Sequence, residues 1–135
     1  MLDTSVCIEL MRGDARDLAQ AIPRHRGGRV VVSSITLAEL RFGEARRARV
    51  VGQARRPTVD DLLAPFEVLP FDAPAADAYG ALRQALEAAG HPIGPLDTLI
   101  AAHALSVGAT VITGNLREFR RVSGLRGSST LPLAP

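Results

Sequence analysis

Short runs of β-branched and aliphatic residues alternate along this chain with longer segments in which apolar residues recur at helical spacing. The clearest short run is Arg29–Ser33, in which three consecutive valines stand between an arginine and a serine. A strand that is apolar on both faces is typical of a parallel sheet that helices cover on each side. Strands that alternate with helices along a chain indicate the same arrangement. The sequence therefore predicts an α/β fold with a central, mainly parallel sheet flanked by helices.

The same periodicity predicts where each element lies, and no repeat or linker divides the 135 residues. Because one hydrophobic core suits a chain of this length, we predict a single domain over residues 1–135. Strands are expected at Met1–Asp3, Arg29–Ser33, Phe66–Leu69 and Thr110–Thr113. The tail 127–135 is expected to form a weak edge strand or to be frayed. Helices are expected at Ser5–Met11, Arg16–His25, Thr36–Arg47, Thr58–Ala64, Pro74–Ala89, Pro95–Val107 and Leu116–Arg120. A stripe from Leu96 to Val107 should be buried, with His103 as a core residue rather than a ligand.

The composition excludes several classes of enzyme. The chain has 16 basic residues of the Lys and Arg types, and all of them are arginine. A P-loop needs a lysine after its glycine, and Schiff-base chemistry needs a lysine amine. Phosphotransfer domains of the receiver or haloacid-dehalogenase type, in which Asp3 would be the acceptor, also rely on a lysine. None of these mechanisms is open to this chain.

Several features point to the cytoplasm. The single cysteine, Cys7, cannot form an internal disulfide bond or build a zinc site from several thiolates. The first residues do not have the basic and apolar regions of a signal peptide, and no apolar run reaches the roughly 20 residues that a membrane span needs. We therefore expect a cytoplasmic protein in which Cys7 is a small core residue.

Arginines cluster in the middle of the sequence, at Arg41, Arg46, Arg47, Arg49, Arg55 and Arg56. A guanidinium group can bind phosphate through two parallel hydrogen bonds, so this stretch is a candidate contact for a polyanion. With four Phe, one Tyr and no Trp, stacking of bases on aromatic side chains cannot be the main means of recognition. The alternative is that the stretch is a solvated helix face or a site for an acidic protein.

Four polar residues lie where an α/β fold gathers its ligands. Asp3 ends the first expected strand, and Asn115 follows a later strand by two residues. Sites in open parallel sheets form beyond the carboxyl ends of the strands. Glu39 and Asp97 are expected in the first turns of two helices, where the helix dipole favours an anion. Three carboxylates and one amide oxygen make a donor set suited to Mg²⁺ or Mn²⁺.

Each of the four residues also has a purely structural interpretation. Glu39 follows Thr36 at the spacing of a capping box, in which its carboxylate would bond to the start of its own helix. Asp97 could serve the helix dipole alone, Asp3 could cap the first helix, and Asn115 could be a turn residue. Taken one at a time, the residues leave both interpretations open.

Taken together, they lie in sequence blocks that resemble the PIN-domain endoribonucleases, and most closely the VapC toxins of bacterial toxin–antitoxin pairs. The blocks are Leu2–Ser5, Ser34–Gly43, Gly90–Asp97, Ile100–Ala104 and Thr113–Phe119. They cover nearly the whole chain, in the order and spacing of the family. The resemblance implies a PIN-like three-layer fold.

The resemblance also implies a site that holds one or two Mg²⁺ or Mn²⁺ ions on the carboxylates of Asp3, Glu39 and Asp97. Asn115 stands where the family has a fourth aspartate or, often in these toxins, an asparagine. Ser5 and Thr113 match small hydroxyl positions that help to arrange the site.

The implied reaction is hydrolysis of phosphodiester bonds in structured RNA, such as tRNA or ribosomal RNA, by a water molecule that the metal activates. The implied partners are a small VapB-type antitoxin and a second copy of the chain in a homodimer. Arg41, Arg46 and Arg47 are the candidate contacts for the RNA.

The chain departs from the family pattern in two places. Only Met1 and Leu2 precede Asp3, so the first strand is shorter than is usual. Asn115 offers a neutral oxygen, which binds a hard cation more weakly than a carboxylate does and so favours a single firmly held metal. Both departures favour an alternative, in which the chain is a PIN-like module that binds nucleic acid or a protein without cutting it.

Overall fold

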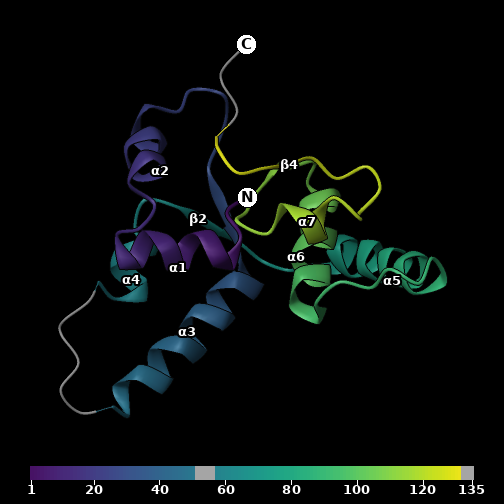
Figure 1. Ribbon diagram of the computed structural model, residues 1–135, viewed down its shortest axis with the longest axis horizontal. Coiled ribbons are helices and arrows are strands. Elements are labelled where there is room, and N and C mark those ends of the chain that lie inside the picture. Colours follow the sequence, from purple (N-terminus) through teal and green to yellow (C-terminus); the bar gives the residue numbers. More distant parts are fainter. Residues whose placement is uncertain (51–56, 132–135) are drawn as a thin grey trace.

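The computed structural model describes residues 1–50 and 57–131, in which helices and strands alternate (Figure 1). The helices are α1 (Thr4–Arg12), α2 (Arg16–Ala21), the 3₁₀ helix η1 (Ile22–Arg24), α3 (Ser34–Ala48), α4 (Val59–Leu63), α5 (Ala73–Ala88), α6 (Pro95–Ser106) and α7 (Leu116–Phe119). The strands are β1 (Val31–Ser33), β2 (Glu67–Leu69), β3 (Val111–Ile112) and β4 (Gly127–Ser128). None of the helices in these two ranges is long and apolar enough to cross a membrane.

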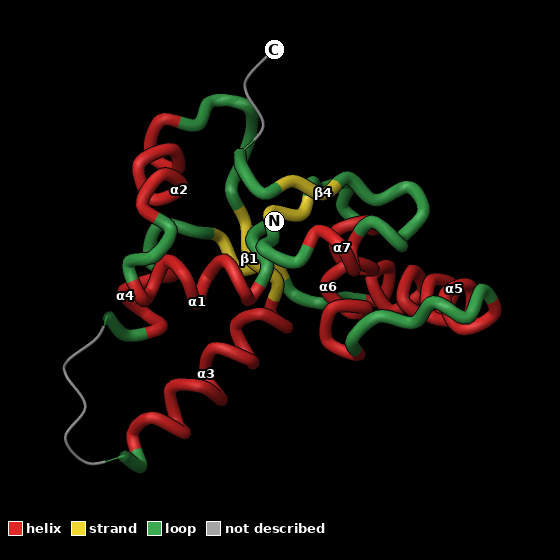
Figure 2. The backbone as a smooth tube through the Cα atoms, viewed as in Figure 1, coloured by secondary structure: helices red, strands yellow, loops and turns green. Residues whose placement is uncertain are grey.

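Neighbouring strands of the sheet are parallel. β1 pairs with β2, where Val32 lies opposite Val68, and β3 pairs with β4, where Ile112 lies opposite Ser128. Leu2 forms a parallel bridge to Val32 on one side and to Ile112 on the other, so it joins the two pairs. The spatial order is therefore β2, β1, Leu2, β3 and β4. Figure 2 shows the strands in yellow among the helices. The prediction of a parallel sheet is confirmed, and the tail supplies its edge strand β4.

The first strand is shorter than the predicted range Met1–Asp3, because α1 begins immediately after Asp3. Leu2 is the residue of this segment that forms β-bridges, and it pairs with a strand on each side. The Leu2 N–H donates to the Val31 carbonyl over 2.9 Å, and the Asp3 N–H donates to the Ile112 carbonyl over 2.9 Å. The centre of the sheet is thus one extended residue that passes directly into a helix, with Asp3 at its carboxyl end.

Alternate residues of the central strands face opposite layers. Val31 and Val111 belong to one buried cluster, with residues of α5 and α6 and with Phe119 of α7. Their neighbours Val32 and Ile112 belong to a second cluster, with residues of α1, α3 and α4. In Figure 1, α1, α2 and α4 accordingly lie on one side of the sheet and α5, α6 and α7 on the other. The sheet is therefore covered on both faces, and the predicted three-layer architecture is confirmed.

Two helices differ from the prediction for local reasons. The helix expected over Arg16–His25 changes to a 3₁₀ turn at Ile22, because Pro23 has no N–H to continue the α-helical bonding. The helix expected from Thr36 begins two residues earlier, because the Ser33 hydroxyl accepts the Ile35 N–H over 3.1 Å and so caps α3 directly at the end of β1.

The buried stripe expected along α6 is wrong at both ends. Leu96 is 44% exposed and Val107 is 47% exposed, whereas Ala101 and Ala102 are fully buried. The small side chains in the middle of α6 pack against α5 and the sheet, and the apolar residues at its ends lie beyond that contact.

We expect Leu2→Ala to lower the free energy of unfolding by about 2–5 kcal/mol, the usual cost of a large-to-small change at a buried site. Leu2 is 0% exposed and lies at the centre of the sheet, so the truncation leaves a cavity between two layers. Urea unfolding followed by circular dichroism measures the change. The control is Leu96→Ala, which removes an exposed side chain and should change stability by no more than about 0.5 kcal/mol. Similar losses in both variants would contradict the central position of Leu2.

Candidate active site

Asp3 is the most constrained side chain at the carboxyl edge of the sheet, and it is only 2% exposed. Its Oδ1 accepts the backbone N–H of Thr4 over 2.7 Å, in the N-cap position of α1. Its Oδ2 accepts the hydroxyls of Ser5 and Thr113 over 2.8 Å each. Because Ser5 belongs to α1 and Thr113 follows β3, the donors come from both sides and hold the carboxylate in one orientation. Asp3 therefore caps the first helix and also faces the two hydroxyl residues expected to arrange the site.

Glu39 reaches this edge from the second turn of α3, as the sixth residue of the helix, and not from the first turn as expected. The capping-box interpretation is wrong, because Ser33 caps the helix and the Thr36 hydroxyl lies 3.3 Å from the Thr4 hydroxyl instead. The Thr4 hydroxyl donates to Glu39 Oε2. This contact draws the Glu39 carboxylate toward α1, where Thr4 directly follows Asp3.

Asp97 lies in the first turn of α6, as predicted, and Glu118 of α7 faces it. The pKa of Asp97 is raised to about 7, first by burial and then by the Asp3 carboxylate, with further contributions from Glu118 and Glu39. The pKa of Glu118 is lowered, chiefly because its carboxylate accepts the backbone N–H of Gly94 over 3.2 Å. Within this pair Asp97 therefore holds a proton more readily than Glu118 does.

Asn115 stands just before α7 at the same edge of the sheet. Its backbone N–H donates to the Thr113 hydroxyl over 2.9 Å, and that hydroxyl in turn donates to Asp3. The Asn115 side chain interacts with Glu118 and helps to lower the pKa of that carboxylate. The structure thus connects Asn115 to Asp3 through Thr113 and to Asp97 through Glu118.

Two residues of this site, Thr4 and Glu118, are not among those predicted from the sequence. A signal for Glu118 is its position three residues after Asn115, since residues at that spacing lie on the same side of a helix. No local signal marks Thr4 as the partner of Glu39. The two residues are 35 positions apart and meet only because α1 packs against α3.

A buried hydrogen bond joins the two helices that carry Glu39 and Asp97. His103 of α6 is 1% exposed, and its Nδ1 lies 2.9 Å from the hydroxyl oxygen of Ser33, the cap of α3. Because that oxygen already accepts the Ile35 N–H, its own hydrogen can point to Nδ1 of a neutral imidazole. Burial lowers the pKa of His103, which favours the same neutral form. His103 is a core residue, as predicted, and it fixes α6 against α3.

The side chains at this edge offer the oxygen donors that Mg²⁺ and Mn²⁺ prefer. In the described ranges, no three His, Cys, Asp or Glu side chains converge closely enough to ligate one ion as they stand. Asp3 and Glu39 nevertheless lie near enough to Asp97 to disfavour its ionisation, and a divalent cation among the three would remove that repulsion. The chemistry of these donors therefore suits such an ion, although in the described ranges the three carboxylates do not converge on one point.

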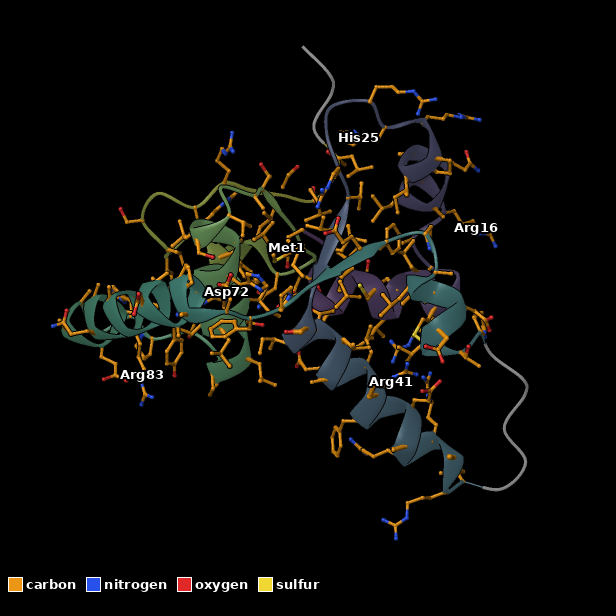
Figure 3. The ribbon with its side chains drawn as sticks, turned by 180° about the vertical axis from the view of Figure 1, so that it is seen from behind. Met1, Arg16, His25, Arg41, Asp72 and Arg83 are labelled. Atoms are coloured by element: carbon orange, nitrogen blue, oxygen red, sulfur yellow. The ribbon has the colours of Figure 1, made fainter. Side chains whose placement is uncertain are left out.

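The predicted RNA contact Arg41 is engaged within the protein. Its guanidinium lies 3.0 Å from the Glu44 carboxylate and 2.5 Å from the Asp60 carboxylate of α4, and Figure 3 shows it beside that helix. Both partners raise the pKa of Arg41, the Asp60 hydrogen bond most strongly. Arg41 therefore ties α3 to α4, and a role in RNA binding would compete with these ion pairs.

The other two predicted contacts, Arg46 and Arg47, line a groove between α1 and α3 that also contains Glu39. Their contact with RNA stays a prediction. Arg55 and Arg56, which belong to the same basic stretch of the sequence, lie outside the described residues.

We expect the metal-free protein to lose stability at Asp97 as the pH rises. The pKa of this group is about 7 in the folded protein against an ordinary value of 3.8, so folding favours its protonated form. The resulting stabilisation is complete below pH 3.8 and is lost as the pH rises through about 7. Asp97→Asn keeps a neutral side chain at every pH. In EDTA, urea unfolding should find this variant more stable than the wild type at pH 8 and similar to it at pH 4.

The matched control for this experiment is Asp77→Asn, at an exposed position of α5. Its difference from the wild type should be the same at both pH values. A variant at Asp97 that is less stable than the wild type at pH 8 would contradict the electrostatic repulsion inferred at this site.

Comparison with known proteins agrees with this geometry. Residues 1–125 match the model of the PIN domain family. The tRNA(fMet)-specific endonuclease VapC of Shigella flexneri is 35% identical to this chain over 126 residues, which is 93% of each chain. The crystal structure of DNA-bound VapBC from Salmonella typhimurium superposes with a TM-score of 0.80 at 36% identity, over 95% of both chains. That of VapBC2 from Rickettsia felis, bound to a DNA fragment from its promoter, gives 0.75 at 30% identity over 95% of this chain and 96% of that one.

The carboxylates at the carboxyl edge of a five-membered parallel sheet, the family match and these relatives lead to one conclusion: the chain belongs to the PIN-domain family and, within it, to the VapC proteins.

Proposed function

We propose that this chain is a metal-dependent endoribonuclease that acts as the toxin of a type II toxin–antitoxin pair. The observation that carries the proposal is the gathering of acidic side chains from separate elements at one edge of the sheet. Asp3 precedes α1, Glu39 belongs to α3, and Asp97 belongs to α6. Three carboxylates that repel one another destabilise a fold unless a cation compensates their charge, so such a group is typical of a functional site.

In this proposal Asp3, Glu39 and Asp97 hold Mg²⁺ or Mn²⁺, and Asn115 offers a fourth, neutral oxygen. A divalent cation bound there would acidify a water molecule for attack on the scissile phosphate and would stabilise charge on the phosphoryl oxygens. Because Asn115 brings no charge, we propose one firmly held ion, with any second ion arriving together with the RNA.

The remaining contacts of the site serve to position these ligands. Ser5 and Thr113 hold the Asp3 carboxylate, and Thr4 holds that of Glu39. As a metal ligand Asp97 would be ionised, and a cation there would offset the repulsion that raises its pKa. Glu118 keeps its own charge because it is anchored on the Gly94 N–H at the start of α6. Loss of Ser5 or Thr113 would therefore weaken metal binding by freeing Asp3 to turn.

We propose structured RNA, such as tRNA or ribosomal RNA, as the substrate, and a VapB-type antitoxin and a second copy of the chain as partners. The Shigella flexneri relative is named as a tRNA(fMet)-specific endonuclease, and the Salmonella typhimurium structure is of a VapBC complex. At 35–36% identity over more than nine tenths of each chain, these names support the same class of substrate and partner here.

The second candidate function is a PIN-like module that binds nucleic acid or a partner protein without cutting RNA. The neutral Asn115 and the single bridging residue at the centre of the sheet favour this alternative. A cleavage assay separates it from the nuclease, because binding alone is compatible with both.

We expect the purified chain to cleave total RNA in the presence of Mg²⁺ or Mn²⁺ and to stop when EDTA is added. Asp97→Asn should lower the rate by more than about 100-fold, because even a group behind a metal ligand is commonly worth 10–100-fold. Asp77→Asn, away from the site, should retain the wild-type rate. Cleavage that resists EDTA, or that survives in Asp97→Asn, would overturn the metal-dependent mechanism.

The ends of the fragments provide a further check on the route of attack. Attack by water predicts 5′-phosphate and 3′-hydroxyl ends, because the 2′-hydroxyl of the RNA takes no part. A cyclic phosphate in the products would instead require the 2′-hydroxyl as the nucleophile.

We expect expression of the wild-type chain alone to arrest bacterial growth, and co-expression of its VapB-type antitoxin to restore growth. The Asp97→Asn chain should be tolerated at the same level of protein, since it folds without the activity. Mapping the 5′ ends of RNA fragments soon after induction would identify the target at the same time. Normal growth with folded wild-type protein present would count against a toxin.

A further inference from the structure

A groove of about 420 Å³ runs between α1 and α3 and opens to the surface beside the acidic site. Met11 and Leu40, both buried, form part of its floor. Glu39, a proposed metal ligand, lies in its lining, and so do Arg12, Arg46 and Arg47. The groove therefore connects the acidic site with a group of arginines.

The spacing along α3 orders these residues within the groove. Glu39 and Arg46 are seven positions apart, which is two helical turns and about 10 Å along the helix axis. Gly43 lies between them in the lining, and a Cβ atom placed on it would meet nothing within 4 Å. The absent side chain at Gly43 leaves the groove open between the acidic end and the basic end. Arg12 faces this basic end from the last turn of α1.

No acid of the described residues engages the three arginines of the groove. Within the described ranges, Arg12, Arg46 and Arg47 form no ion pair with an acid, in contrast to Arg41 on the same helix α3. The guanidinium of Arg46 lies 5.6 Å from the centre of the Phe42 ring, and this contact orients the group without using its N–H donors. Phe42 is itself 65% exposed.

We propose that the α1–α3 groove holds the RNA strand next to the cleavage site, with Arg12, Arg46 and Arg47 as its phosphate contacts. The assignment rests on the proposed nuclease function and adds Arg12, which no sequence pattern indicated. A strand bound by these arginines lies one or two nucleotides from a phosphate at Glu39. Planar guanidinium groups match the oxygens of a phosphate, and a continuous path to the acidic site favours a nucleic acid over an acidic peptide.

The first test measures binding in EDTA, so that its outcome does not depend on cleavage. The probe is a fluorescein-labelled, unstructured single-stranded RNA of 12 nucleotides, followed by anisotropy over a range of salt concentrations. Arg12→Gln, Arg46→Gln and Arg47→Gln should each reduce the slope of log affinity against log salt by about 0.7, and the triple variant by about 2. The matched control is Arg49→Gln, which removes the same charge beside these residues but lies outside the lining. Its slope should equal that of the wild type.

The second test blocks the groove without removing charge. Gly43→Leu adds a side chain in open space and replaces a helical glycine, so the temperature of unfolding should stay the same or rise. RNA binding should nevertheless weaken at least tenfold. Gly80→Leu on α5 is the matched control, because Gly80 is also helical and also has open space around it. That variant should bind RNA as the wild type does.

The outcomes distinguish this proposal from the proposed nuclease function. RNA cleavage with unchanged salt slopes in the three arginine variants, or full binding by Gly43→Leu, overturns the groove alone. If the arginine variants reduce the salt slope but the wild-type chain cuts no RNA, the assignment of the groove to RNA is supported and the proposed nuclease function is overturned. If the arginine variants bind RNA normally but lose a VapB-type antitoxin, the groove is a protein site and the assignment to RNA is wrong. A wild-type chain that does not bind the RNA probe also overturns it.

Discussion

The carboxylate of Asp3 joins the secondary structure to the acidic site. Its three hydrogen bonds come from the first turn of α1 and from Thr113 just after β3, so the same group caps a helix and links it to the neighbouring strand. The residue before it, Leu2, connects the two halves of the sheet. The centre of the sheet and the acidic site are therefore built from adjacent residues. A short first strand is sufficient here because helix capping and side-chain bonds act where further ladder bonds would otherwise be needed.

Bringing several carboxylates together raises the pKa of one of them, Asp97. Asp97 retains its proton up to a pH of about 7 because burial and the Asp3 carboxylate oppose its ionisation. Glu118 stays charged beside it because a backbone N–H compensates that carboxylate. Protonation of Asp97 thus removes a negative charge from this edge of the sheet. The helices that carry Glu39 and Asp97 are joined beneath this site by the hydrogen bond between Ser33 and His103.

The basic stretch of the sequence divides in space into two parts. Arg41 and its acidic neighbours stabilise the contact between α3 and α4. Arg46 and Arg47 turn to the other side of α3, toward α1 and Arg12. Arginines of one segment therefore have different surroundings, because successive residues of a helix point in different directions. Counting arginines along the sequence does not reveal this division.

The layered fold and the positions of most elements follow from patterns in the sequence, and so does the prediction of which side chains offer oxygen donors. Two local properties can be recognised in the sequence. They are the apolar periodicity and the spacing of Asp3, Asp97 and Asn115 relative to the ends of strands and helices. The contacts of Glu39 with Thr4, of Glu118 with Asp97 and of Arg41 with two acids are evident only in the folded chain. These contacts depend on how α1 packs on α3, α7 on α6 and α3 on α4. The free energy of such packing is shared among many distant residues, and no short pattern encodes it.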